Sequence, residues 1–389
     1  MTSRIPVFFL MEVKMDFLNE LSFLTEGFGA LTWKMVAMWI LGAVLIFLAI
    51  KKDMEPALLL PMGFGAILVN LPFSAVAVEG EGIIAQLFKV GIEAGEAMPL
   101  LLFIGIGAMI DFGPLLANPK LFILGGAAQL GIFVTMILAA MIGFPVNDAA
   151  SIAIIGAADG PTSIMVAQRL MSNYVGPIMV VAYSYMALVP IVQPVVIKAC
   201  TTKKERLIRM HYNAKQVPKV LKIIFPIAVS IVAGLIAPGS LSLVGMLMFG
   251  NLLRECTVLG SLSDTAQTSF SNIITLLLGL TISFQMKAEA FMRIETLIIM
   301  VLGLFAFVFD TFGGIMCAKI MNLFSKEKIN PMVGAAGISA FPMASRVVEK
   351  MGIKEDPCNH LLMHAAGANV SGQIASAVVG GLIIGFIAH

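Results

Sequence analysis

The sequence predicts an all-α polytopic membrane protein, on the evidence of its composition, the length of its apolar runs and its internal similarity. Of the 389 residues, 59% are hydrophobic and only 12% are charged. Apolar runs recur from Trp33 to the end of the chain, and a helix needs about 20 apolar residues to cross a bilayer. The net charge of +2 is no sign of nucleic-acid binding, because the basic residues lie between the apolar runs. We expect no nucleic-acid partner.

The elements can be assigned in order along the chain. Residues 1–33 form an N-terminal segment in which Met15–Thr32 mixes acidic and large apolar side chains, as is typical of an interfacial helix. Two later runs, of about 10 to 14 residues, predict tilted, broken or re-entrant pieces: Leu58–Leu71 and Leu241–Leu253. Others are long enough to span, alone or with their flanks: Val36–Ile50, Leu121–Ile142, Val175–Ile197, Thr296–Phe309 and Val370–Ile387.

The two halves of the chain resemble one another. Three segments of the first half recur in the same order in the second: Met62–Leu68 in Leu247–Leu253, Leu100–Phe112 in Thr275–Lys287, and Gly156–Leu170 in Gly334–Val348. A fusion of two similar halves explains this order. We therefore divide the chain into a first membrane repeat (34–200), a basic linker (201–222) and a second membrane repeat (223–389).

The most informative segment is GAADGPTS, residues 156–163, because it places Asp159 between apolar runs. An aspartate at the centre of a membrane helix costs about 2.5 to 3.5 kcal/mol, so it normally has a partner. Interrupted segments at matching positions of two repeats, here the GAA motifs beginning at Gly156 and Gly334, indicate a transporter's binding site. Close helix packing by Gly and Ala is the alternative, but it does not explain Asp159, Asn330 or Arg346.

The linker sets the orientation. It carries seven basic residues against Glu205 alone, which the positive-inside rule places in the cytoplasm. If each GAA segment is a hairpin that does not cross, each half makes an odd number of crossings, and the repeats are inverted. The Asp159 hairpin would then enter from outside, and the Asn330 hairpin from the cytoplasm.

The polar residues near the breaks are hard oxygen donors, which favour Na⁺ over a transition metal. Tyr185 could donate a proton, although a tyrosine in a membrane helix is more often part of an aromatic belt. Arg346 could bind an anionic group through its planar guanidinium, or it could extend to the interface or pair with Glu349. No GxxxxGK[ST] motif occurs, so direct use of ATP is not supported.

Four motifs carry a resemblance to a known family: GAMIDFGPLLANP, GAADGPTS, AYSYMALVPIVQP and GANVSGQIASAV. They resemble the β subunit of the biotin-dependent, sodium-pumping decarboxylases, a group that includes the oxaloacetate, glutaconyl-CoA, methylmalonyl-CoA and malonate enzymes. The resemblance runs from about Lys34 to the end of the chain. It implies a membrane subunit that decarboxylates carboxybiotin, consumes a proton and exports Na⁺.

The same resemblance implies partners and location. Carboxybiotin would reside on a partner subunit, with no biotin attached to this chain. The partners would be a biotin carrier protein, a carboxyltransferase α subunit and a small membrane subunit. This chain would form a homotrimer in the cell (inner) membrane.

The resemblance also implies roles for individual residues. Asp159 corresponds to the family's essential sodium-binding aspartate, Tyr185 to its functional tyrosine, and Arg346 to the arginine that meets carboxybiotin. We count all three as catalytic candidates. The positions associated with Na⁺ are Asp159, Asn330, Gly334, Ser339, Asn369 and Ser376.

Two other functions use some of the same features. A sodium-coupled secondary transporter of a small organic anion would use the same repeats and the same Arg346. A scaffold that only holds partner subunits in the membrane would tolerate replacement of Asp159. The sequence does not identify the acid or acyl-CoA that is decarboxylated, because that specificity would lie on a partner polypeptide.

Overall fold

The computed structural model describes residues 26–52, 54–210 and 217–387, and every regular element in these ranges is a helix. Seven helices are long and apolar enough to cross a membrane by length and composition. They span Trp33–Lys52, Leu121–Ile142, Val175–Cys200, Lys219–Ile236, Gly260–Met286, Ile294–Phe324 and Leu362–Ile387. The expected all-α, multi-pass membrane class is confirmed. Most of the expected interfacial segment, 1–33, lies outside the described residues.

The two halves share one order of elements. The first has α2 (Trp33–Lys52), short α3 (Pro56–Val69), interrupted α4–α5 (Ile83–Phe88 and Ala97–Met109), α7–α8 (Leu121–Ala127 and Leu130–Ile142), the hairpin α9–α10 (Val146–Ala153 and Gly160–Arg169) and α11 (Val175–Cys200). The second has α13 (Lys219–Ile236), short α14 (Leu241–Glu255), interrupted α15–α16 (Gly260–Thr265 and Ser271–Ser283), α18 (Ile294–Phe324), the hairpin α19–α20 (Pro331–Ala335 and Met343–Glu355) and α21 (Leu362–Ile387). This matches the internal sequence similarity, while inversion of the repeats stays a prediction.

The third element of each half contains a π-helical segment, and in the first half this element is also broken and bent. The helix pair 83–93 and 97–109 bends by 68°. A π-helical segment follows α4 at Lys89–Glu93, and another follows α15 at Ala266–Phe270. Such segments loosen the regular hydrogen-bond ladder and are frequent at functional sites. The π-helical segments at corresponding places in the two halves support a common origin.

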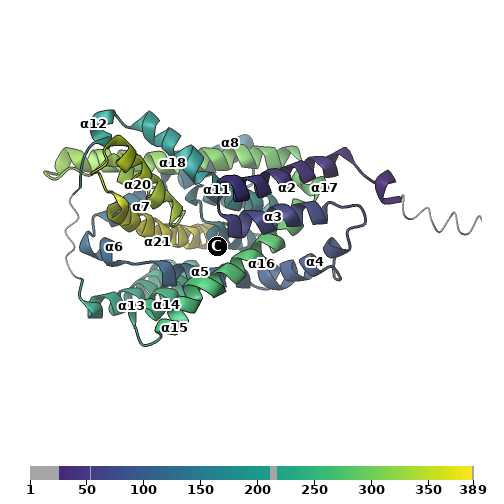
Figure 1. Cartoon of the computed structure of the whole chain (residues 1–389), viewed down its shortest axis with the longest axis horizontal. Coiled ribbons are helices and arrows are strands. Elements are labelled where there is room, and N and C mark those ends of the chain that lie inside the picture. The colour runs from purple at the N-terminus through teal and green to yellow at the C-terminus, as the bar shows by residue number, and fades with distance from the viewer. Residues whose placement is uncertain (1–25, 53, 211–216, 388–389) are drawn as a thin grey trace, which may run out of the picture.

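The halves pack against each other through small residues. Helix α3 lies against α16, α5 against α14 and α8 against α18, and Figure 1 shows α5, α14 and α16 together along one side of the molecule. A Cβ added at Gly107 would stand 1.9 Å from the carbonyl oxygen of Leu247, and one added at Gly250 would stand 2.0 Å from that of Ile104. Only glycine allows these backbones to approach so closely.

The linker is held to both halves by charged side chains. Lys222, near the start of α13, donates to the Asp111 carboxylate at 3.1 Å, just beyond the end of α5. Partial burial would raise the pKa of Asp111, but the N–H of Gly113 and the Lys222 ammonium outweigh it, and the pKa lies below its usual value. On the other side, Arg206 pairs with Glu355 of α20 at 2.8 Å. The basic linker is therefore anchored where it meets each repeat.

Candidate functional site

The first hairpin breaks where the sequence predicts. Helix α9 tightens into the 3₁₀ turn η3 (Ile154–Ala157), and Ala158 then adopts a left-handed conformation with φ 53°. Asp159 is extended, and Pro161 stands in the first turn of α10, where its missing N–H costs nothing. The break leaves Asp159 at the tip of the hairpin, between two helices whose own residues are almost all buried.

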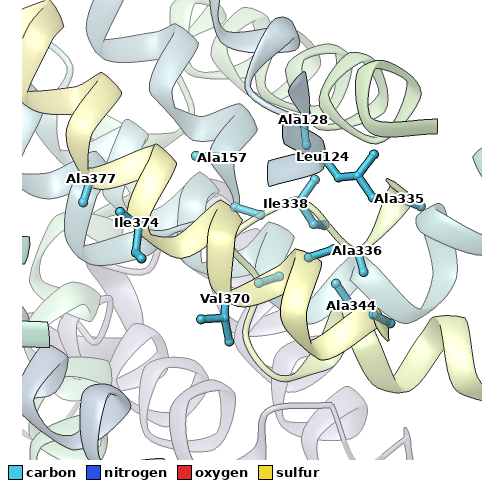
Figure 2. Packing of buried hydrophobic residues seen from close by; sticks show 14 of the residues in the cluster. Leu124, Ala128, Ala157, Ala335, Ala336, Ile338, Ala344, Val370, Ile374 and Ala377 are labelled. Carbon is cyan, nitrogen blue, oxygen red and sulfur yellow. The ribbon is translucent and has the colours of Figure 1, made fainter. Parts of the chain in front are cut away.

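The second hairpin meets the first at its break. Helix α19 ends at Ala335, and a non-helical stretch leads to α20. Within that stretch the N–H of Ser339 donates to the carbonyl of Ala157 at 3.0 Å. Figure 2 shows Ala157 of the first hairpin and Ala336 and Ile338 of the second beside α21. The two interrupted segments, distant in sequence, thus form one buried junction.

Asp159 is the centre of this junction. It is only 3% exposed, and its Oδ2 accepts three hydrogen bonds. The donors are Thr162 Oγ1 of α10 at 2.5 Å, and Ser376 Oγ and Gln373 Nε2 of α21 at 3.1 and 3.2 Å. All three are neutral, and the described residues provide no ion pair to this carboxylate. Its negative charge is stabilised by dipoles but is not neutralised.

Gln373 is a site residue that the sequence analysis missed. It lies three residues before Ser376 on α21, and residues at this spacing share one face of a helix. Once Ser376 is assigned to the site, that spacing is the signal that could have identified Gln373. Gln373 is 2% exposed, so its side chain contacts other parts of the protein and not the solvent.

Helix α21 connects both hairpins. Towards the second hairpin, Asn369 Nδ2 donates to the carbonyl of Ile338 at 2.6 Å, and Gly372 presents its carbonyl to Ser339 Oγ at 3.0 Å. The Oδ1 of Asn369 is buried and has no hydrogen-bond partner among the described residues. A free, buried amide oxygen is an available cation ligand. Ser339, Asn369 and Ser376 therefore lie on the same assembly as Asp159.

Asn330 precedes α19 at the start of the second hairpin, and Gly334 lies near the end of that helix. Asn330 caps α19 by accepting from the N–H of Met332 at 3.1 Å, and its Nδ2 donates to the carbonyls of Arg206 and Ile208 in the linker at 2.9 and 2.8 Å. Gly334 packs on α18, where an added Cβ would stand 2.1 Å from the carbonyl oxygen of Gly314. In this conformation both residues hold the hairpin to the linker and to α18.

The two tyrosines of α11 face different neighbours. The ring of Tyr183 lies on Gly160, where an added Cβ would be 2.3 Å from the ring carbon that bears the hydroxyl. The Tyr183 hydroxyl is buried without a hydrogen-bond partner among the described residues. The Tyr185 hydroxyl instead donates to the carbonyl of Met300 on α18. Tyr183, which the sequence analysis did not select, is the tyrosine beside the Asp159 segment.

Arg346 lies on the first turn of α20 and is exposed. The alternative partner considered from sequence, Glu349, is occupied elsewhere. It contacts His360 Nδ1 at 2.9 Å and accepts from the N–H groups of Leu361 and Leu362 at 2.6 and 2.7 Å. No ion pair to Arg346 occurs in the described part of the chain. Glu55, just before α3, attracts this arginine electrostatically, and the exposed guanidinium remains accessible to an anion from outside the protein.

Comparison with known proteins identifies relatives along nearly the whole chain. Residues 34–387 match the family model described as Na⁺-transporting oxaloacetate decarboxylase beta subunit. The methylmalonyl-CoA decarboxylase subunit beta of Propionigenium modestum is 47% identical, over 92% of this chain and 96% of its own. The glutaconyl-CoA decarboxylase subunit beta of Acidaminococcus fermentans is 46% identical over 93% and 96%. The oxaloacetate decarboxylase beta chain of Klebsiella pneumoniae is 41% identical over 95% and 99%.

Proposed function

The chain belongs to the family of Na⁺-transporting oxaloacetate decarboxylase beta subunits, and from this membership we propose that it decarboxylates carboxybiotin, with proton consumption, and couples the reaction to Na⁺ export. A biotin carrier protein delivers the carboxybiotin, and a carboxyltransferase α subunit loads it. A small membrane subunit and two further copies of this chain complete the assembly in the cell (inner) membrane.

The observation that carries this proposal is the environment of Asp159. Three neutral donors on α10 and α21 hold one carboxylate oxygen, and no described side chain supplies a positive charge. A buried carboxylate is costly unless a cation or a proton neutralises it. Na⁺, a hard cation, prefers carboxylate, amide and hydroxyl oxygens. A site that can hold either Na⁺ or a proton suits a pump that exchanges one for the other.

The remaining Na⁺ positions divide into two groups. Ser376 contacts Asp159 directly, while Ser339 Oγ and the free Oδ1 of Asn369 are oxygens of the same junction. We propose that these three complete the ion's coordination. Asn330 and Gly334 would contribute only if the second hairpin moved, because the Asn330 amide is engaged with the linker and Gly334 is pressed against α18.

The chemistry needs an anion site and a proton. When the C–N bond of carboxybiotin breaks, CO₂ leaves and the ureido nitrogen of biotin takes up a proton. Arg346, exposed and planar, fits the role of holding the carboxylate in bidentate fashion. Tyr185 is our candidate for proton transfer, and to act it would have to exchange its present bond to the Met300 carbonyl for one towards the site.

The test uses the purified protein reconstituted in liposomes with free carboxybiotin. We expect CO₂ release that requires Na⁺ and is accompanied by Na⁺ movement across the membrane, both absent in Asp159→Asn. Asp148→Asn is the matched control, because Asp148 is equally buried but its oxygens are held by Ser172 and Asn173. Sodium-driven anion uptake without decarboxylation would instead identify a secondary transporter.

A further inference from the structure

A second carboxylate is buried on α18, outside the site described above. Asp310 is 0% exposed, and its Oδ1 accepts from the N–H of Ile132 at 3.2 Å. Ile132 lies in the first turn of α8, just after the turn that separates α7 from α8. The N–H of Ile132 also donates to the carbonyl of Gln129 at 3.2 Å, so the carboxylate is a second acceptor for a backbone group at the start of α8.

The second oxygen of Asp310 is not explained by that role. Its Oδ2 is buried and has no hydrogen-bond partner among the described residues. It points towards Gly156, where an added Cβ would stand 2.7 Å from it. Gly156 belongs to η3 of the first hairpin, three residues before Asp159. Glycine at this position leaves the space into which the free oxygen faces.

Other unpaired oxygens lie along the same α8 segment. Gln129, the residue before α8, is 1% exposed and its Oε1 has no partner in the described ranges. Thr135 Oγ1 is fully buried and is likewise without a partner there. Thr135 is one turn beyond Gly131, whose added Cβ would touch Asp310 Oδ1, so both residues share the face of α8 that meets α18. Buried polar atoms are normally paired, so the free oxygens of Asp310 and Thr135, both at the contact of α8 with α18, are available as ligands.

No described cation neutralises Asp310. Helices α7, α8 and α19 and the η3 turn carry no ionisable side chain. Lys319 lies nine residues further along α18. At 1.5 Å per residue this separates it from Asp310 by about 13 Å along the helix axis, and it pairs with Glu205 at 3.0 Å. Other ionisable groups on α18 and on the helices packed against it are Asp148 of α9, Tyr183, Tyr185, Lys198 and Cys200 of α11, and Glu295 and Cys317 of α18.

We propose that Asp310 is a second cation-binding carboxylate, which takes up Na⁺ or a proton beside the hairpin that carries Asp159. This inference rests on the proposed function, since it assigns the ion to the same transport cycle. A carboxylate in this setting must be neutralised, and an amide would satisfy the N–H of Ile132 equally well. An aspartate at this position, where asparagine could accept the same hydrogen bond, points to binding of a positive charge.

The experiment compares wild type with Asp310→Asn, Asp159→Asn and the double variant, purified without biotin or partners. Equilibrium binding of radioactive Na⁺ gives the stoichiometry, and infrared difference spectra report protonated carboxyl groups. If Asp310 binds Na⁺, Asp310→Asn and Asp159→Asn each bind one fewer ion per chain, and the double variant binds none at the two sites. If it binds a proton, stoichiometry in Asp310→Asn is unchanged but a carboxyl band disappears.

Asp310→Asn protein identical to wild type in both measurements would overturn the inference and leave Asp310 as a helix cap. If Asp310→Asn does not fold, the Asp159→Asn variant alone tests the inference. It retains Asp310, and loss of all Na⁺ binding together with all carboxyl bands would overturn the inference. Asp148→Asn controls for loss of a buried acid. Failure of wild type to bind any Na⁺ would contradict the proposed function separately, because the carboxyl band of Asp310 could still be detected.

Discussion

The N–H of Ser339 donates to the carbonyl of Ala157 at 3.0 Å, and this hydrogen bond joins the tips of the two interrupted hairpins. A backbone bond between the hairpins makes the position of one depend on the other. Helix α21 strengthens the connection, because Gly372 holds Ser339 and Ser376 holds Asp159. An ion at Asp159 can therefore influence the second hairpin, on whose side Arg346 lies.

We predict that Ser376→Ala weakens Na⁺ binding about tenfold or more, because a hydrogen bond to a charged group contributes about 1.5 to 3 kcal/mol. Ser371→Ala on the same helix is the control, since that hydroxyl donates to the carbonyls of Leu121 and Ala368. Na⁺-dependent thermal stabilisation of the purified protein measures the effect. Equal losses in the two variants would show that a general disturbance of α21, and not a lost donor to Asp159, is responsible.

Gly160→Ala should destabilise the protein by about 1 to 3 kcal/mol, the usual cost of overpacking. The new methyl group would lie 2.3 Å from the Tyr183 ring, whereas nothing lies within 4 Å of a Cβ at Gly126, which makes Gly126→Ala the control. Thermal unfolding compares the two variants. Tyr183→Leu should offset part of the loss, because contacting residues show non-additive effects. Purely additive losses would place the strain elsewhere.

The membrane class could be predicted from sequence because long apolar runs have few other uses. The boundaries could not. The run Thr296–Phe309 predicts a span alone or with its flanks, and α18 extends well beyond it to Phe324, with the Asp310 carboxylate accepting from the N–H of Ile132. That same contact accompanies the break within Leu121–Ile142, which the sequence presents as one continuous apolar run. Local composition encodes neither the full length of α18 nor the tertiary contact at this break.

Some residues of the candidate site could likewise be predicted from the sequence and others could not. Asp159 is visible because an acid contrasts with its apolar surroundings, and the family resemblance indicates Ser376. The choice between Tyr183 and Tyr185 is not visible, because residues two apart in a helix point to different sides and the sequence does not say which side meets the hairpin. The partners of Asn330 are backbone carbonyls of the linker, which leave no side-chain signature.

The linker between the repeats is predicted to be cytoplasmic. In a background without the four native cysteines, Lys204→Cys, which is exposed on α12 (Lys203–Arg206), should react in intact cells with a permeant thiol reagent but not with an impermeant one. Glu81→Cys, exposed in the acidic loop after α3, should react with both. The opposite pattern would reverse the topology and the side from which each hairpin enters.

Arg346→Lys should lower carboxybiotin turnover strongly while Na⁺ affinity changes little. Lysine keeps the charge but lacks the planar fork that binds a carboxylate with two hydrogen bonds. The control is Lys350→Arg, which alters an exposed basic residue one turn further along α20. Steady-state decarboxylation and Na⁺ titration separate the two quantities. Normal turnover in Arg346→Lys would show that this arginine is only a charge at the membrane interface and does not bind carboxybiotin.

The last prediction is that Na⁺ and a proton compete for Asp159. Its Oδ2 is held by Thr162, Gln373 and Ser376, and these neutral donors stabilise the ionised form without neutralising it. Na⁺ requires the ionised carboxylate, whereas loss of the ion from so buried a position favours uptake of a proton. Cytoplasmic Na⁺ would therefore occupy the site, and a proton from outside would displace it and continue to the biotin nitrogen. Apparent Na⁺ affinity should weaken as pH falls.

The competition is measured by Na⁺-dependent stabilisation and by activity between about pH 5.5 and about pH 8.5, a range chosen to cover carboxyl titration in a protein. Asp159→Asn should abolish Na⁺ coupling at every pH while leaving the protein folded, because the amide is nearly isosteric with the carboxylate. Circular dichroism and gel filtration verify the fold of the variant. Na⁺ affinity that stays flat with pH, or an Asp159→Asn protein that still pumps, would contradict exchange at this carboxylate and move the coupling site elsewhere.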